Sequence, residues 1–340
     1  MSTFIWFLKQ ILYFLILIVF VLLSVAFYVL LERQILGHVT RRQGPSTVGI
    51  FGALQTIADA LKLLAKESIF PKSANTIIFL FAPIFTCGLA LANWAVIPFG
   101  NGWAVADFNL GILYLLALSS LSVHSIIMAG WSSNSKYAFL GALRSAAQMI
   151  SYEIALGLIL LSIILLAQSL NLNDIVMAQY NIWFFLPLLP LFLMFMICIL
   201  AETNRHPFDL PEAEAELVSG YNVEYSAVGF VLFFLAEYSN IIMMSVFTAI
   251  LFLGGWNVPC YYILWPIEND YLRALVESYL LPTTFFTLKS MFVMIFFVVI
   301  RTSLPRYRYD QLMRLGWKIF LPIALVFLII YISFLKLFWF

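Results

Sequence analysis

Long apolar stretches separated by polar connections recur along the whole chain of 340 residues. A helix that crosses a membrane needs about 20 predominantly apolar residues. Eight stretches reach this length and predict eight transmembrane helices, at 10–31, 77–97, 110–130, 146–167, 182–203, 226–253, 281–300 and 319–339. The stretches are continuously apolar and do not alternate with polar residues, which excludes a transmembrane β-barrel.

The first apolar stretch lies where a secretory signal peptide would lie. It is longer than such a peptide, and it ends at Leu31-Glu32-Arg33 without a small-residue cleavage site, so we expect a retained helix. The chain shows neither a repeat of fixed period nor the inverted pair of broken helices found in transporters. We therefore expect an all-α fold with a single membrane domain, residues 1–340.

Composition agrees with this pattern. Hydrophobic residues make up 64% of the chain and charged residues 10%, whereas soluble domains are roughly 45–50% apolar and about 25% charged. Too few polar side chains are present to cover a water-soluble surface, and a disordered chain is excluded for the same reason. The net charge of +1 gives no support for nucleic-acid binding.

Basic residues gather on one side of the predicted bundle. Eight spans place both termini on one side and four connections on the other. These connections are 32–76, 131–145, 204–225 and 301–318. They hold 14 of the 18 Lys and Arg residues, so the positive-inside rule assigns them to the cytoplasmic or matrix face.

Cysteine and histidine patterns limit the redox chemistry of the chain itself. Three cysteines and three histidines lie far apart, and no C-x-x-C or Cys/His cluster is present. Ligand sets for iron–sulfur clusters, zinc and covalent haem are therefore missing. If the protein takes part in redox chemistry, we expect a partner to hold the redox centres.

An acidic run after the fifth span is the strongest candidate for chemistry. Its acids are Glu202, Asp209, Glu212, Glu214, Glu216 and Glu224. Two prolines interrupt the helix there, while Glu212 and Glu216 are one helical turn apart, and crowded carboxylates raise each other's pKa. A solvated acidic loop is the plain alternative, but Phe208 and the apolar flanks favour a cavity wall that also includes Arg205.

Two further acids, Glu153 and Glu237, fall inside predicted spans. A carboxylate at mid-membrane costs about 2.5–3.5 kcal/mol on insertion scales, so such groups usually face a bundle interior or a wet cavity. Together with Glu202 they suggest a file of acids leading inward from the acidic run. The alternative is a set of neutral, hydrogen-bonded acids that join helices.

The first inner connection predicts an amphipathic helix over residues 54–65. Its apolar residues recur at helical spacing, and Asp59 lies on the opposite face, which is typical of a helix on a membrane surface. It either anchors the chain to anionic headgroups or forms one wall of a cavity that opens to a lipid-borne ligand. In the last inner connection, the arginines of 301–313 are suited to pair with the acidic run, to meet a soluble partner, or only to orient the chain.

Eight motifs resemble one family in type and order. They are Leu-Glu-Arg-Gln-Ile-Leu-Gly at 31–37, Arg-Gln-Gly-Pro at 42–45, Ala-Asp-Ala-Leu-Lys-Leu at 58–63, Ala-Gly-Trp-Ser-Ser-Asn-Ser-Lys-Tyr-Ala at 129–138, Ser-Tyr-Glu at 151–153, the run 201–225, Leu-Gly-Gly-Trp at 253–256 and Pro-Arg-Tyr-Arg-Tyr-Asp-Gln-Leu-Met at 305–313. The chain thereby resembles the quinone-site membrane subunit of respiratory complex I over most of its length. It departs from the family pattern at Thr40, Gln43, Ser46, Ser68 and His206.

The resemblance implies a quinone tunnel formed with the soluble arm of NADH:ubiquinone oxidoreductase. It implies ubiquinone as substrate, flavin and iron–sulfur clusters on partner subunits, no cofactor on this chain, and antiporter-like membrane subunits as further partners. The implied tunnel residues are Glu32, Arg33, Arg42, Asp59, Glu67, Arg205, Phe208 and Arg301. The implied proton-coupling residues are Glu153, Glu202, Asp209, Glu212, Glu214, Glu216, Glu224 and Glu237.

The resemblance also favours the mitochondrial inner membrane over a bacterial plasma membrane. Two alternative functions remain open from the sequence. One is a related subunit of a membrane-bound hydrogenase-type complex, and the other is a stand-alone ion-coupled transporter.

Overall fold

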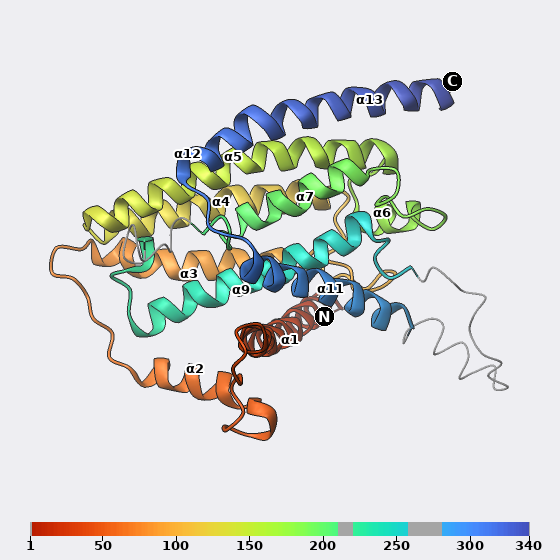
Figure 1. Ribbon diagram of the computed structural model, residues 1–340. Coiled ribbons are helices and arrows are strands. Elements are labelled where there is room, and N and C mark those ends of the chain that lie inside the picture. The colour runs from red at the N-terminus through yellow and green to blue at the C-terminus, as the bar shows by residue number, and fades with distance from the viewer. Residues whose placement is uncertain (1, 210–219, 258–280, 340) are drawn as a thin grey trace.

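The computed structural model describes residues 2–209, 220–257 and 281–339, and every regular element in these ranges is a helix (Figure 1). The helices are α1 (Ser2–Val39), η1 (Ile50–Gly52), α2 (Gln55–Ala65), α3 (Thr76–Asn93), α4 (Gly111–Ser132), α5 (Lys136–Ala167), α6 (Leu172–Ala178), α7 (Leu189–Glu202), η2 (Gly220–Asn222), α9 (Ala227–Phe252), α11 (Leu281–Ser303), α12 (Tyr309–Arg314), η5 (Leu315–Phe320) and α13 (Leu321–Trp339). The predicted all-α fold is confirmed for this part of the chain.

Seven helices in the described ranges are long and apolar enough to cross a membrane. They are Lys9–Val39 within α1, Thr76–Asn93, Gly111–Ser132, Lys136–Ala167, Ala227–Phe252, Leu281–Ser303, and the continuous stretch Tyr309–Phe334. The count differs from the predicted eight at the fifth span, 182–203. There only the 14 residues of α7 are helical, or about 21 Å of helix against a hydrocarbon layer of about 30 Å.

Proline accounts for the short fifth helix. Pro187 precedes α7, and Pro190 occupies its first turn, where a missing backbone N–H costs nothing. Residues before Leu189 form turns instead, because a helix that continued back through Pro190 would lose a hydrogen bond. Apolarity alone cannot distinguish these turns from a helix.

Two helices begin well before their predicted spans. The helix α5 starts at Lys136 rather than near 146, and the last helical stretch starts at Tyr309 rather than near 319. The predicted connections 131–145 and 301–318 are therefore largely helical. Polar residues in the early part of α5 do not end the helix, because Ser145 is fully buried against other helices rather than solvated.

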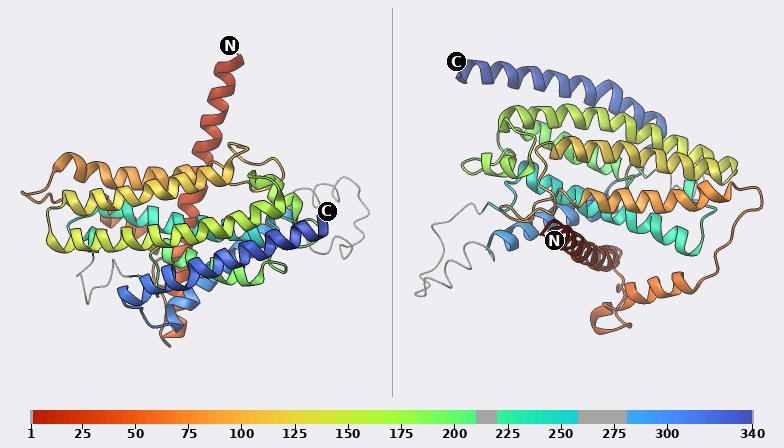
Figure 2. Two further views of the ribbon diagram at one scale, coloured as in Figure 1. Left: turned by 90° about the horizontal axis from the view of Figure 1, so that it is seen from above. Right: turned by 180° about the vertical axis from the view of Figure 1, so that it is seen from behind.

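The helices α3, α4, α5 and α9 run alongside one another, and α13 lies along α5 (Figure 1). The helix α1 instead crosses the direction of this bundle, as the view from above shows (Figure 2). The helix α2 lies at the edge of the bundle, where it contacts the end of α1 and the helix α9 (Figure 1). This arrangement brings the last two turns of α1 and the last turn of α11 together with the middle of α9 and the segment that follows α7.

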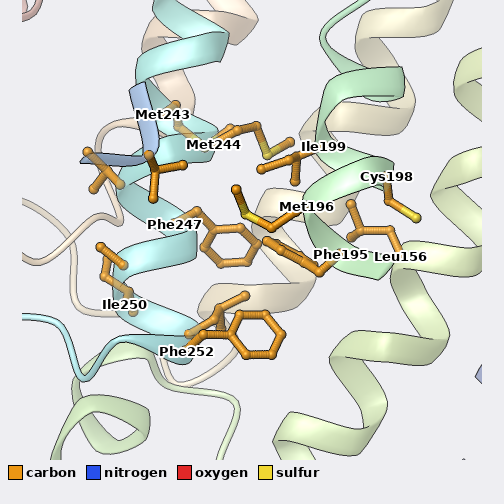
Figure 3. Packing of buried hydrophobic residues seen from close by; sticks show 14 of the residues in the cluster. Leu156, Phe195, Met196, Cys198, Ile199, Met243, Met244, Phe247, Ile250 and Phe252 are labelled. Atoms are coloured by element: carbon orange, nitrogen blue, oxygen red, sulfur yellow. The ribbon is translucent and has the colours of Figure 1, made fainter. Parts of the chain in front are cut away.

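The short helix α7 is packed inside the bundle. Phe195 of α7 lies 5.1 Å from Phe252 and 6.2 Å from Phe247, both on α9, measured between ring centroids (Figure 3). Cys198 and Ile199 of α7 are fully buried. This contact between α7 and α9 supports the charged groups described below.

Candidate functional site

Glu32, near the end of α1, is the centre of a buried group of charges. Its carboxylate is in contact with the guanidinium of Arg301 from α11 and lies 3.6 Å from Nη1 of Arg205. The hydroxyl of Tyr238 on α9 donates a hydrogen bond of 2.7 Å to the same carboxylate. Glu32 is only 4% exposed, so these groups replace water around its charge.

Arg205 joins this group to a second carboxylate. Its Nε lies 2.8 Å from Oε1 of Glu237, and its guanidinium stacks over the ring of Tyr238 at 4.3 Å from the centroid. The planar guanidinium can serve two carboxylates and an aromatic face at once, which a lysine cannot do. We call Glu32, Arg205, Glu237 and Arg301 the four-charge cluster.

The four-charge cluster contains two acids and two bases. Its charges therefore cancel when all four groups are ionised, which meets the requirement that buried charges be paired. Aromatic rings flank it, because Tyr28 packs edge-on against Tyr238 at 5.9 Å and Phe234 lies 4.4 Å from Tyr238. The cluster is thus a polar site set within an aromatic wall.

Glu202 and Glu153 form a second polar region. Ser119 and Ser120 of α4 donate hydrogen bonds of 3.3 and 2.5 Å to Oε1 of Glu153. Ser119 also lines a cavity of about 20 Å³ together with Glu202, and that volume admits about one water molecule. Within the described ranges, Oε2 of Glu202 is buried without a hydrogen-bond partner.

The predicted file of three acids is divided in two. Glu237 belongs to the four-charge cluster, whereas Glu202 and Glu153 lie around Ser119 and the small cavity. The helix α9 connects the two regions, because Asn240 lines the cavity three residues after Glu237. Glu237 and Asn240 are three residues apart, so the same face of α9 carries both the paired carboxylate and the amide that lines the cavity.

The start of the acidic run is held against the arginine-containing segment 301–313. Nη2 of Arg306 lies 3.3 Å from Oδ2 of Asp209, and the ring of Phe208 stacks on Tyr307 at 5.6 Å. The predicted contact between these two runs is therefore present. Burial and the neighbouring Arg306 lower the pKa of His206. Glu212, Glu214 and Glu216 lie outside the described residues.

The implied tunnel mouth is only partly brought together. Arg33 pairs with Asp59 of α2 at 2.5 Å, which ties α2 to α1. Arg42 is exposed and donates to Thr40 at 3.2 Å, and Glu67 is exposed in the segment after α2. Neither joins Arg33 and Asp59. The remaining implied residue, Glu224, is half-buried between η2 and α9.

Several residues of the site were not expected from the sequence. They are Tyr28, Ser119 and Gln148. Each places a polar group inside an apolar helix, and buried polar groups nearly always have a partner. That rule flags such residues as candidates, but it does not say which partner each one meets.

Metal coordination would need several ligands held close together. Among the described residues, no group of three or more His, Cys, Asp or Glu side chains is arranged to hold a metal ion. The chemistry that the described site offers is therefore that of paired charges, carboxylates and hydroxyls.

Comparisons with known proteins identify similar chains. A family model described as NADH dehydrogenase matches residues 12–332. The chain is 58% identical to NADH-ubiquinone oxidoreductase chain 1 of Chondrus crispus over 91% of both proteins. It is 56% identical to a subunit of the NADH-quinone oxidoreductase of Rhodospirillum centenum, over 91% of this chain and 89% of the relative. It is 55% identical to NADH-ubiquinone oxidoreductase chain 1 of Arabidopsis thaliana, over 89% of this chain and 90% of the relative.

Proposed function

Because the chain belongs to the NADH dehydrogenase family, and is thereby a membrane subunit of an NADH–quinone oxidoreductase, we propose that it forms the quinone-access tunnel with the soluble arm of that complex. Its partners are other subunits of the complex. We propose that these include the soluble subunits at the quinone site, which carry the iron–sulfur clusters, and the antiporter-like membrane subunits. Flavin belongs to the partner subunits as well, and ubiquinone is the substrate at the interface.

The chain is a multi-pass membrane protein, and we propose eight spans in the mitochondrial inner membrane. The helix α7 is the fifth span, since it packs inside the bundle between α5 and α9. The helix α2 lies on the membrane surface, because its residues Ile57, Leu61 and Leu64 are all exposed while none of its residues is buried. The Arg33–Asp59 pair holds this surface helix beside the end of α1.

The observation that carries the proposal is the gathering of ionisable groups, most of them buried or half-buried, within and beside apolar helices. Glu32, Arg205, Glu237 and Arg301 are assembled into one cluster, and Glu202 lies nearby with Glu153. Such groups are costly in a membrane and usually mark an ion or substrate pathway. Glu32 and Arg301 lie near the ends of α1 and α11, and we propose that a reaction at the soluble arm acts on the cluster there.

The chemistry of quinone reduction gives these residues a task. Reduction of ubiquinone to ubiquinol takes up two electrons and two protons, and the electrons come from partner subunits. A change of charge at the quinone perturbs nearby ion pairs, since electrostatic interactions are strong where water is excluded. We propose that Glu202, Glu153 and the acidic run transmit this perturbation to proton transfer.

Glu202→Gln tests this proposal in the intact complex. We expect quinone-linked proton translocation to fall while NADH oxidation by an artificial acceptor at the flavin site stays at the wild-type level. Unchanged translocation in the assembled variant would contradict the proposed coupling. Ion or substrate flux through the purified chain alone would instead indicate a stand-alone transporter.

A further inference from the structure

Two residues within the acidic run, Phe208 and Gly220, lie on either side of residues 210–219, and both contact the same helix, α5. The described part of the chain stops at Asp209 and resumes at Gly220. Phe208 and Gly220 each meet a residue of α5 on the inner side of the bundle.

The departing end is held by Gln148. This side chain is fully buried, and its Nε2 donates hydrogen bonds of 2.7 Å to the carbonyl oxygen of Ala201 and 2.9 Å to that of Phe208. One amide group thus joins the end of α7 to the first residues of the acidic run. Tyr152, one turn further along α5, packs its ring 6.0 Å from that of Phe208.

The returning end is held by a close approach of two glycines. A Cβ atom added to Gly141 would lie 2.8 Å from the Cα of Gly220 and 3.1 Å from the backbone nitrogen of Tyr221. These are backbone atoms, so no side chain can move aside. Gly220 has φ +66°, a conformation that favours glycine. Tyr221 then anchors the segment by packing against Phe233 of α9 at 5.4 Å.

The spacing on α5 places both contacts on one face. Gly141 and Gln148 are seven residues apart, which is about two turns and about 10 Å along the axis. Glu153 follows on the same helix and carries one of the buried carboxylates. A single rigid helix therefore sets the positions of Phe208, Gly220 and Glu153 relative to one another.

We propose that α5 supports the acidic run. Gly141 and Gln148 are positioning residues that fix Gly220 and Phe208 relative to Glu153. This inference rests on the proposed function, because the acids matter only if they couple quinone reduction to proton transfer. A methyl group at Gly141 would force the returning end away by about 0.6 Å, since ordinary contacts begin near 3.4 Å.

Gly141→Ala in the intact complex tests the proposal, with Gly157→Ala as its matched control. Gly157 lies on the same helix, and a Cβ added there meets nothing within 4 Å. Hydrogen exchange at the backbone amides of 220–226 reports the contact made by Gly141, and exchange at those of 203–209 reports the contact made by Gln148, in both cases without reference to activity. We expect faster exchange in Gly141→Ala and wild-type exchange in Gly157→Ala.

The functional readout is the number of protons translocated per electron together with quinone-linked turnover. We expect one or both to fall about threefold to tenfold in Gly141→Ala, since small misplacements of positioned groups cost rate, while the artificial-acceptor rate and Gly157→Ala stay unchanged. Gln148→Met, which keeps the volume but removes both hydrogen bonds, should reproduce the effect. It takes the place of Gly141→Ala if that variant does not assemble.

The two readouts separate the possible failures. Unchanged hydrogen exchange in the assembled Gly141→Ala and Gln148→Met variants would refute the claim that α5 holds this segment in place. Faster exchange with unchanged turnover and proton ratio would overturn the positioning role. Failure of the proposed function appears independently, as full coupling in Glu202→Gln.

Discussion

Removing the negative charge of Glu32 should destabilise the protein far more than removing an exposed charge. Glu32→Gln preserves side-chain volume but removes the carboxylate that pairs with Arg301, while Arg205 keeps its contact with Glu237. Breaking a buried ion pair by removing one partner costs about 3–5 kcal/mol. Because the Arg301 side chain is 40% exposed and Arg205 keeps a second carboxylate, we expect about 3 kcal/mol, the low end of that range.

Asp59→Asn provides the matched control for this prediction. Asp59 and Arg33 also form a close ion pair, but their side chains are 35% and 44% exposed, so the loss should be about 0–1 kcal/mol. The assay is the apparent melting temperature of the purified complex. It is measured as the fraction of quinone-linked activity that remains after heating to each temperature. Equal shifts in Glu32→Gln and Asp59→Asn would refute the claim that burial strengthens the four-charge cluster.

Two further predictions concern residues near the ends of the bundle. The pKa of His206 is lowered from its usual value of 6.5 by burial and by Arg306, so the unfolded chain binds a proton more readily. Stability should be complete above about pH 6.5 and decline as the pH falls below it, and thermal melts of His206→Gln should lose this pH dependence. Gly254→Ala should lower the melting temperature, at a cost of about 1–3 kcal/mol from overpacking, because its Cβ would lie 2.7 Å from the ring of Trp183. Gly102→Ala is its control, having a similar φ of +72° but nothing within 4 Å, and an equal loss in both variants would show that backbone strain alone is responsible.

The apolar pattern predicted most of the helices but not where they end. The apolar pattern shows which residues are suited to lipid or to the core. A helix, in contrast, continues as long as its backbone N–H and C=O groups find hydrogen-bond partners. The helix α5 therefore extends back to Lys136, past the half-buried Arg144 and the buried Ser145. At the fifth span the opposite holds, since Pro190 limits the helix within a stretch that is uniformly apolar.

The sequence also identified the acids and arginines of the site without their pairing. Glu32, Arg205, Glu237 and Arg301 were all candidates, yet they were divided between a tunnel and a proton path. The structure joins them in one cluster. The Tyr238–Glu32 hydrogen bond spans 206 residues of sequence, and no local spacing encodes such a contact. The crossing of α1 over the bundle brings Glu32 close to Tyr238, in the middle part of α9, and to Arg301, near the end of α11 (Figure 2).

The four-charge cluster has a consequence for how the protein is made. Glu32, Glu237 and Arg301 lie in three different helices, α1, α9 and α11, and each charge is uncompensated while its helix is alone in the membrane. Of the three, Glu237 lies well inside its helix, where an isolated charge costs about 2.5–3.5 kcal/mol, whereas Glu32 and Arg301 lie near the ends of α1 and α11. The charge in α1, which is synthesised first, thus finds its partners only after most of the chain has been inserted. The pairing of Glu32 is therefore completed late, when α9 and α11 have arrived.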